Sequence, residues 1–236
     1  LRKEWAKFSW VEAESKYREQ LIELYGVTRI LGFPDAIPLE SIFVDVFITD
    51  TLPIQRRSPT AKRKRHHALR PLLSHNRVFI VGGPGAGKTT FLKYLVLQAC
   101  KGKIDKTPIY VSLKEWARLG ISLIDFISRE FEICGFPNPP SFIQYILENG
   151  KAIVFLDGLD EVTSLDTENA IQEIVEFERS YLLAQIVITS RLPVDYTFER
   201  FTYFEITKFD DRQVRSFVNK WFTQSVIAVS YTHLTL

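Results

Sequence analysis

The residue pattern with the clearest chemical meaning is a glycine-rich segment, Gly82–Thr89, that reads GGPGAGKT. It matches G-x-x-x-x-G-K-[ST], the pattern of a phosphate-binding loop. Glycines let backbone N–H groups curve around phosphate oxygens, because no Cβ obstructs them. Lys88 would place its charge on the terminal phosphates, and the Thr89 hydroxyl would ligate Mg²⁺. We therefore predict a nucleoside triphosphate site whose contacts come from Gly82, Gly83, Pro84, Gly85, Ala86, Gly87, Lys88, Thr89 and Thr90.

A second candidate site follows Ile153–Leu156, an apolar segment with the length and composition of a buried strand. Asp157 ends this segment, and a carboxylate at this place beside a phosphate loop is the usual support for Mg²⁺. Asp160 and Glu161 follow shortly after it. Either carboxylate could orient and polarise an attacking water molecule as general base. A surface acidic turn without chemistry is the alternative interpretation.

A third pattern is Ile186–Arg191, an apolar segment that ends in Thr189, Ser190 and Arg191. Any of these three polar side chains could contact the γ-phosphate of a nucleotide. Arg191 could also offset the negative charge that develops during phosphate transfer. The alternative is an arginine that simply lies on the surface after a strand.

These candidate residues need a sheet to bring them together. Two helix starts carry capping signals, from Ser122 with Asp125 and from Asp210 with Gln213. From Arg77 onward apolar segments of strand length alternate with helical segments, which favours an α/β domain with a parallel sheet. The expected strands are 78–81, 109–113, 152–156, 185–189 and 203–206, and the expected helices include 89–100, 141–149 and 168–183.

The net charge of +2 conceals an uneven distribution. The segment Thr51–Ile104 holds 12 Lys and Arg and no Asp or Glu, whereas the other residues hold 18 basic and 28 acidic ones. Six of the twelve lie in Arg56–Arg65, which we interpret as a solvated linker. A nucleic-acid surface is the second interpretation. No aromatic residues are interleaved there to stack on bases, so we rank it lower.

We divide the chain into four segments. Residues 1–50 form a helical and extended leader, 51–76 a basic linker, 77–222 the nucleotide-binding core, and 223–236 a non-native or truncated tail. Within the leader, we expect residues 1–33 to be helical and 39–48 to be extended. The tail lacks a helical period. The sequence contains no Met, even at position 1, so we expect the chain to be cut at both ends.

Cysteine content and hydropathy indicate the compartment. Cys100 and Cys134 are the only cysteines, which are too few for a disulfide scaffold and form no C-x-x-C pattern. A reducing cytoplasm fits this usage. No apolar run approaches the ~18 residues that a bilayer-spanning helix needs. We therefore expect a cytoplasmic protein without a membrane partner.

Together the three patterns resemble the NACHT family, within the STAND class of signalling P-loop NTPases. The resemblance rests on Gly82–Thr90, Phe155–Val162 and Ile188–Arg191, in this order and spacing, and extends over about residues 17–222. It implies a three-layer P-loop fold with a mostly parallel, five-stranded sheet of the additional-strand type. The Arg191 strand would lie between the P-loop strand and the Asp157 strand.

The resemblance also implies the ligands and the activity. It implies ATP, or GTP, with Mg²⁺ held by Asp157 and Thr89, and slow hydrolysis with Asp160 as the hydrolytic acid. It implies a signalling switch that forms a homo-oligomer when the full-length protein is ATP-bound, in bacterial defence or regulation. Members continue into a helical lid and a winged-helix subdomain, and this chain stops before most of these parts.

Two alternatives from other functional classes stay open. The first is a scaffold that binds nucleotide without turning it over. The second is a nucleic-acid-dependent ATPase that uses the basic residues of Arg56–Arg65.

Overall fold

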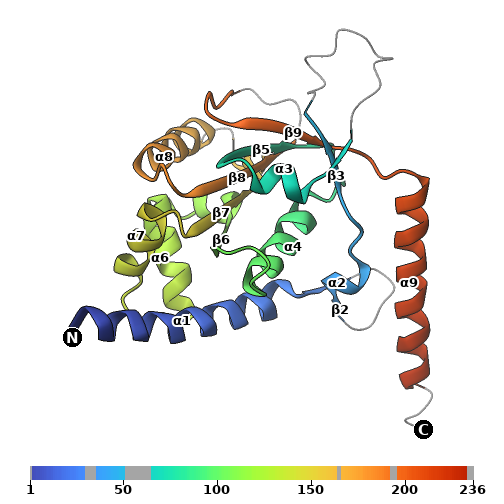
Figure 1. The fold of residues 1–236 in the computed structure, drawn as a ribbon. Helices are drawn as coiled ribbons and strands as arrows, with labels where there is room; N and C mark the ends of the chain where they lie inside the picture. The colour runs from blue at the N-terminus through green and yellow to red at the C-terminus, as the bar shows by residue number, and fades with distance from the viewer. Residues whose placement is uncertain (1, 30–35, 51–64, 164–165, 192–195, 233–236) are drawn as a thin grey trace.

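A seven-stranded sheet forms the centre of the protein (Figure 1). The computed structural model describes residues 2–29, 36–50, 65–163, 166–191 and 196–232, with side chains from 10 to 223. The strand order is β4-β3-β9-β5-β8-β7-β6. The strands are β3 (Phe47–Thr49), β4 (His66–His67), β5 (Arg77–Val81), β6 (Thr107–Ser112), β7 (Ala152–Asp157), β8 (Gln185–Ser190) and β9 (Thr202–Ile206); β1 (Val27–Thr28) and β2 (Ile37–Pro38) pair separately.

The five strands of the predicted core are all parallel to one another, in the order β9-β5-β8-β7-β6. The strand of Arg191, β8, lies between β5 and β7, as the resemblance implied. The predicted number of five strands is wrong for the whole sheet. β3 pairs antiparallel with β9, and β4 pairs antiparallel with β3. These leader and linker residues occupy hydrogen-bonding groups that an edge strand would otherwise expose.

Helices cover both faces of the parallel strands. α4 connects β5 to β6, α6 and α7 connect β6 to β7, and α8 connects β7 to β8. Because such crossovers are right-handed, α4 lies on one face and α6, α7 and α8 on the other, which gives three layers (Figure 1). The helices are α1 (Arg2–Tyr25), α2 (Leu39–Ile42), α3 (Leu69–Leu73), α4 (Lys88–Cys100), α5 (Leu113–Ala117), α6 (Leu123–Ile133), α7 (Pro139–Glu148), α8 (Thr167–Ser180) and α9 (Asp211–Thr232).

The central strands are buried because helices lie on both sides of them. Every residue of β7 and of β8 is buried, which agrees with the unbroken apolar run 152–156 in β7 and with the apolar residues 186–188 in β8. The two predicted capping signals are confirmed. The backbone N–H of Asp125 donates to the Ser122 hydroxyl at 3.1 Å, and Gln213 N–H donates to the Asp210 carboxylate at 2.9 Å.

The leader helix α1 runs along the outer edge of the sheet beside β6 (Figure 1). The Tyr17 hydroxyl donates to the Pro108 carbonyl at 3.0 Å, and its ring stacks on Phe131 at 4.1 Å. The Arg18 guanidinium donates to the Ala99 and Lys106 carbonyls. The leader is therefore packed against the domain that contains the central sheet, and it covers the β6 edge.

Three expectations for the ends and the linker need correction. The first helix ends at Tyr25 and not near residue 33, and residues 39–42 form the short helix α2 before the extended segment. Part of the segment that we interpreted as a linker is regular structure, in β4 and α3, whereas residues 51–64 lie outside the described residues. The backbone of the tail is helical as far as Thr232. The capping box at Asp210 nucleates α9, and an existing helix extends easily.

A buried ion pair anchors the start of β5. The side chains of Arg77 and Glu178 are each 8% exposed, and Nε lies 3.2 Å from the carboxylate. Arg77 also donates to main-chain carbonyls, among them Tyr181 O at 2.9 Å. Burial lowers the pKa of Arg77, and Glu178 opposes this shift.

We predict that Arg77→Met lowers the free energy of unfolding by about 3–5 kcal/mol, because Glu178 stays buried without its main partner. Urea denaturation measures this change. The double variant Arg77→Met/Glu178→Leu should recover much of the loss, since no buried charge then remains there. A single variant as stable as the parent would contradict the assigned role of the pair.

Candidate functional site

The segment Gly82–Gly87 connects β5 to α4 as a loop with open space on one side. Gly85 and Gly87 have φ angles of +70° and +84°, a backbone conformation that other residues rarely adopt. A Cβ built on Gly83, Gly85 or Gly87 would meet no atom within 4 Å. Among the described residues, no side chain caps the start of α4. This loop and helix start can therefore receive the oxygens of a phosphate chain.

Lys88 lies over the same loop. Its Nζ donates to the carbonyl of Gly82 at 2.8 Å and to that of Gly83 at 3.3 Å. Partial burial lowers the pKa of Lys88, while the charge of Asp160 opposes this shift and that of Arg191 adds to it. The carboxylates of Asp157 and Glu161 act on the same ammonium group. The fold therefore brings charged residues of all three sequence patterns into one electrostatic environment.

Asp157 stands at the end of β7 with both carboxylate oxygens hydrogen-bonded. It is 8% exposed. The Tyr110 hydroxyl donates to Oδ2 at 2.8 Å, and the Thr189 hydroxyl donates to Oδ1. Thr189 also accepts the Gly158 N–H at 2.9 Å. The Thr189 hydroxyl, one of our three candidates for γ-phosphate contact, is therefore directed at the carboxylate that ends the neighbouring strand.

Asp160 and Arg191 form a close pair. The backbone N–H of Arg191 donates to Asp160 Oδ1 at 2.8 Å, and its Nε lies 3.0 Å from Oδ2. Ser190, the third candidate, donates its hydroxyl to the Arg191 carbonyl at 3.2 Å. Glu161 is exposed in the 3₁₀ turn Leu159–Glu161. Of the two candidate general bases, only Asp160 is thus bonded to a residue of the third pattern.

The residues present fit Mg²⁺ bound together with a nucleotide. Within the described part of the chain, no group of three or more His, Cys, Asp or Glu side chains is placed to hold a metal by itself. Mg²⁺ at nucleotide sites takes one or two carboxylates together with phosphate oxygens and water. The Asp157 carboxylate and the exposed Thr89 hydroxyl supply donors of this kind.

A cavity of about 1130 Å³ continues from the phosphate loop. Gly83, Gly85 and Thr90 line one end of it. The remainder is mainly apolar and comes from the leader, from the end of β9 and from α9. These lining residues include Leu39, Ile42, Phe43, Val44, Val46, Ile206, Phe209 and Phe217. The cavity thus joins a phosphate-binding end to an apolar end that suits a flat aromatic base.

The leader's part in this cavity was missed by the sequence analysis. The segment 39–48 was expected only to be extended, and no motif marks it. Its apolar residues were a usable signal, since Phe43 stacks on Tyr94 of α4 with ring centroids 3.6 Å apart. This contact joins the leader to the helix that starts at the phosphate loop.

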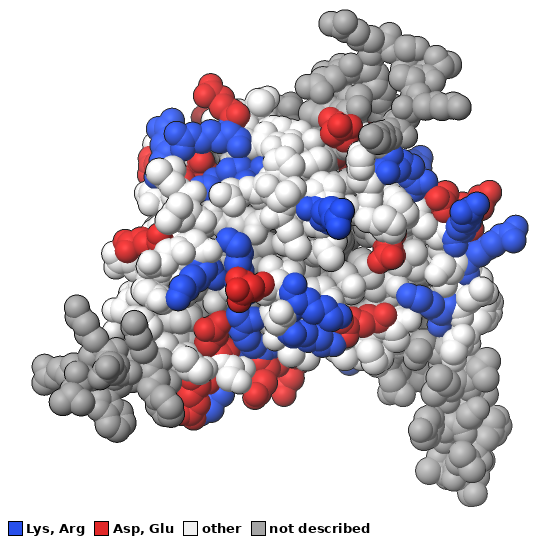
Figure 2. All heavy atoms as spheres, viewed as in Figure 1, with Lys and Arg blue, Asp and Glu red and all other residues white. Residues whose placement is uncertain are grey.

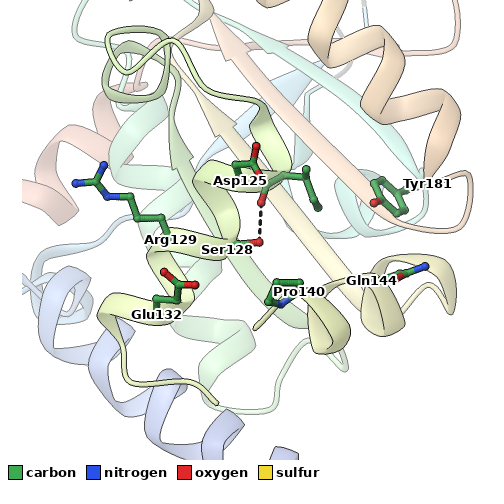
Figure 3. A pocket seen from close by; sticks show the side chains of 8 residues that line it. Asp125, Ser128, Arg129, Glu132, Pro140, Gln144 and Tyr181 are labelled. Carbon is green, nitrogen blue, oxygen red and sulfur yellow. Dashed lines mark hydrogen bonds between the residues drawn. The ribbon is translucent and has the colours of Figure 1, made fainter. Parts of the chain in front are cut away.

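A second, smaller cavity of about 360 Å³ lies between α6, α7 and the residue after α8 (Figure 3). Its lining includes Asp125, Arg129, Gln144 and Tyr181. The Ser128 hydroxyl donates to the Ile124 carbonyl of its own helix at 2.9 Å. None of the residues predicted from the three motifs lines this cavity.

The basic segment Arg56–Arg65 is represented in the described residues by Arg65. Its guanidinium donates to Asp210 at 2.9 Å and to Gln213 at 2.8 Å, and it lies 4.8 Å from the centre of the Phe47 ring. On the face drawn in Figure 2, basic and acidic side chains are interspersed. Arg65 therefore joins the linker to the start of α9.

Helices within the described ranges all lack the combined length and apolar character needed to cross a bilayer.

The class of P-loop NTPase domains is defined by two features of this fold. A phosphate loop follows β5, and the neighbouring parallel strands β8 and β7 end next to Arg191 and in Asp157. Within this class the chain belongs to the NACHT family, because the family model described as "NACHT domain" matches residues 76–225. The comparison with curated proteins gives no match.

Three solved structures illustrate the likeness to other proteins. A DNA replication initiation factor is 19% identical, with 66% of this chain and 48% of that chain covered and a TM-score of 0.44. AMPPCP-bound DnaA from Aquifex aeolicus is 16% identical, with 66% and 49% covered and a TM-score of 0.41. Replication initiator DnaA bound to AMPPCP and single-stranded DNA is 18% identical, with 66% and 48% covered and a TM-score of 0.42. The chain thus spans about half the length of the solved structures that it matches.

Proposed function

We propose that this chain is the nucleotide-binding part of a signalling switch, which binds ATP, or GTP, with Mg²⁺ and hydrolyses it slowly. The observation that carries the proposal is the open side of the loop at Gly83, Gly85 and Gly87, next to the Lys88 ammonium. Backbone N–H groups and one cation around open space suit a phosphate chain. Membership of the NACHT family supports the same function.

Each site residue has a proposed role. The N–H groups from Gly82 to Thr90 bind the phosphates, and Lys88 neutralises their charge. When bound, Mg²⁺ would supply Lewis-acid polarisation of the phosphate oxygens. Asp157 and Thr89 would hold this ion. The apolar end of the cavity takes the base and keeps water away from it.

The hydrolytic step is proposed for the other two charged patterns. Asp160 accepts a proton from the attacking water as general base, with Glu161 as the neighbouring candidate. Arg191 forms an ion pair with Asp160, and its charge acts on Lys88, which supports a role for Arg191 in contacting the γ-phosphate. In that position its charge would offset the charge that develops on the phosphate.

Calorimetry and phosphate release test this proposal together. We expect titration with ATP in the presence of Mg²⁺ to give one saturable site per chain, and omission of Mg²⁺ to weaken binding. A parallel titration with GTP determines the base preference. Absence of saturable binding of either nucleotide would refute the function. Light scattering in ADP and in a non-hydrolysable ATP analogue tests the proposed nucleotide-controlled oligomerisation.

The cytoplasmic location and the signalling role are further parts of the proposal. Cys100 and Cys134 are both free cysteines, which suits a reducing compartment. The signalling role, in bacterial defence or regulation, rests on the resemblance to the STAND class.

A binding-only scaffold is the second candidate function, and one observation favours it. Both carboxylate oxygens of Asp160 are bonded to Arg191. If this pair persists with nucleotide bound, the charge of Asp160 is directed at Arg191 instead of at an attacking water, which disfavours turnover. Phosphate release by a chain that binds ATP separates the two candidates.

A further inference from the structure

The Asp157 carboxylate is held by a tyrosine that the sequence motifs do not include. Tyr110 lies in the middle of the edge strand β6, where it pairs in register with Phe155 of β7. Its hydroxyl reaches the last residue of β7 and donates to Asp157 Oδ2 at 2.8 Å. With Thr189 bonded to Oδ1, the two hydroxyl groups fix the plane of the carboxylate. Either hydroxyl alone would leave the group able to rotate about its Cβ–Cγ bond.

The position of Tyr110 depends in turn on the leader helix. The ring of Tyr25, the last residue of α1, packs against the Tyr110 ring with centroids 4.8 Å apart and a 50° angle between planes. Lys93 of α4 lies over the Tyr25 ring, with its Nζ 5.5 Å from the ring centroid. Upstream hydrogen bonds from Tyr17 and Arg18 to main-chain carbonyls hold α1 against the sheet edge. A continuous chain of contacts therefore runs from the leader helix to Asp157.

We propose that Tyr110 is a positioning residue for Asp157, and that the leader helix α1 holds Tyr110 in place through the ring of Tyr25. The inference rests on the proposed function, since it concerns how the acid is oriented toward Mg²⁺. Groups that orient a metal-binding carboxylate by hydrogen bonds commonly change metal affinity by 10- to 100-fold when they are removed. The leader thus contributes to the metal site although it carries no ligand of its own.

Tyr110→Phe tests the first part, because it removes the hydroxyl and keeps the buried ring. We expect the free Mg²⁺ concentration that half-saturates binding of a fluorescent ATP analogue to rise about tenfold. Affinity for the analogue in EDTA should stay unchanged. This split separates a metal-positioning role from a general loss of structure, which would weaken binding under both conditions.

Tyr203→Phe is the matched control. Tyr203 lies on β9, and its hydroxyl accepts the Phe198 N–H at 2.8 Å, away from Asp157 and from the leader helix. We expect its Mg²⁺ requirement to equal that of the parent. Equal Mg²⁺ requirements in Tyr110→Phe and Tyr203→Phe would overturn the positioning role.

Variants at Tyr25 test the second part. Tyr25→Ala removes the ring that packs on Tyr110 and should raise the Mg²⁺ requirement. Tyr25→Phe keeps the ring and should restore the parent value, because the contact with Tyr110 is made by the ring. An unchanged Mg²⁺ requirement in Tyr25→Ala would overturn the link to the leader.

Failure of this inference can be told apart from failure of the proposed function. If the parent chain does not bind the ATP analogue, with or without Mg²⁺, the proposed function itself is refuted. If the parent binds it in a Mg²⁺-dependent way and Tyr110→Phe behaves identically, only the positioning role is refuted.

Discussion

Replacement of Lys88 by Ala is expected to abolish measurable nucleotide binding, with a loss of affinity of at least about 100-fold. The ammonium group is held over the loop by the carbonyls of Gly82 and Gly83, at 2.8 and 3.3 Å. A phosphate chain in the loop would receive this charge at close range and partly out of water, where charge-assisted hydrogen bonds are strong. Without it, the loop would offer the phosphates its backbone N–H groups but no charged side chain. Isothermal titration calorimetry with ATP and Mg²⁺ measures the change.

Lys103→Ala is a suitable control for this variant. Lys103 lies just beyond the C-terminal end of α4, so its removal changes the net charge by the same amount far from the loop. We expect it to bind ATP as the parent does. Equal affinities of the Lys88 and Lys103 variants would contradict the proposed phosphate site.

Local patterns explain why the phosphate loop could be predicted from the sequence. The residue types in Gly82–Thr89 are required by the loop's own backbone, including positive φ at Gly85 and Gly87. Asp157 could be predicted for a related reason. The unbroken apolar run before it indicates a buried strand, and Asp157 is the carboxylate at the end of that strand. Both signals lie within fewer than ten consecutive residues. They specify the local geometry without reference to the rest of the chain.

The partners of these residues could not be predicted in this way, because they depend on how separate strands align. Tyr110 reaches Asp157 only because β6 and β7 pair with Ser112 opposite Asp157. Thr189 reaches it only because β8 follows β7 with Leu156 opposite Ile188. A shift of one residue would turn each side chain to the opposite face. Sequence patterns in a single strand contain no information on this register.

The apolar end of the cavity illustrates a second limit. Phe43 and Phe217 both line it, although more than 170 residues separate them in the chain. Each is an ordinary apolar residue in its own segment. Only the pairing of the leader strand β3 with β9 and the packing of α9 against α2 make them part of one site. The sequence analysis treated the leader as a segment that precedes the domain. In the structure, the leader forms part of the cavity wall.

Asp160→Asn should lower the rate of ATP hydrolysis by about 100-fold or more while ATP remains bound, because an amide cannot act as a general base. Asn keeps an oxygen that can accept the Arg191 N–H, so the turn after β7 should keep its shape. Phosphate release in single-turnover experiments measures the rate, and calorimetry confirms that the variant binds nucleotide. Undiminished turnover in Asp160→Asn would remove Asp160 from the catalytic role.

Glu161→Gln is the matched variant for this experiment, since it neutralises the adjacent carboxylate in the same 3₁₀ turn. Asp160 and Glu161 are both exposed residues, and Asp160 is bonded to Arg191 through both of its carboxylate oxygens. We expect turnover in Glu161→Gln to stay within a few-fold of the parent, because Arg191 connects Asp160, rather than Glu161, to the third sequence pattern. A large loss in Glu161→Gln together with normal turnover in Asp160→Asn would assign the general base to Glu161. Asp160 would then act mainly by holding Arg191 in position.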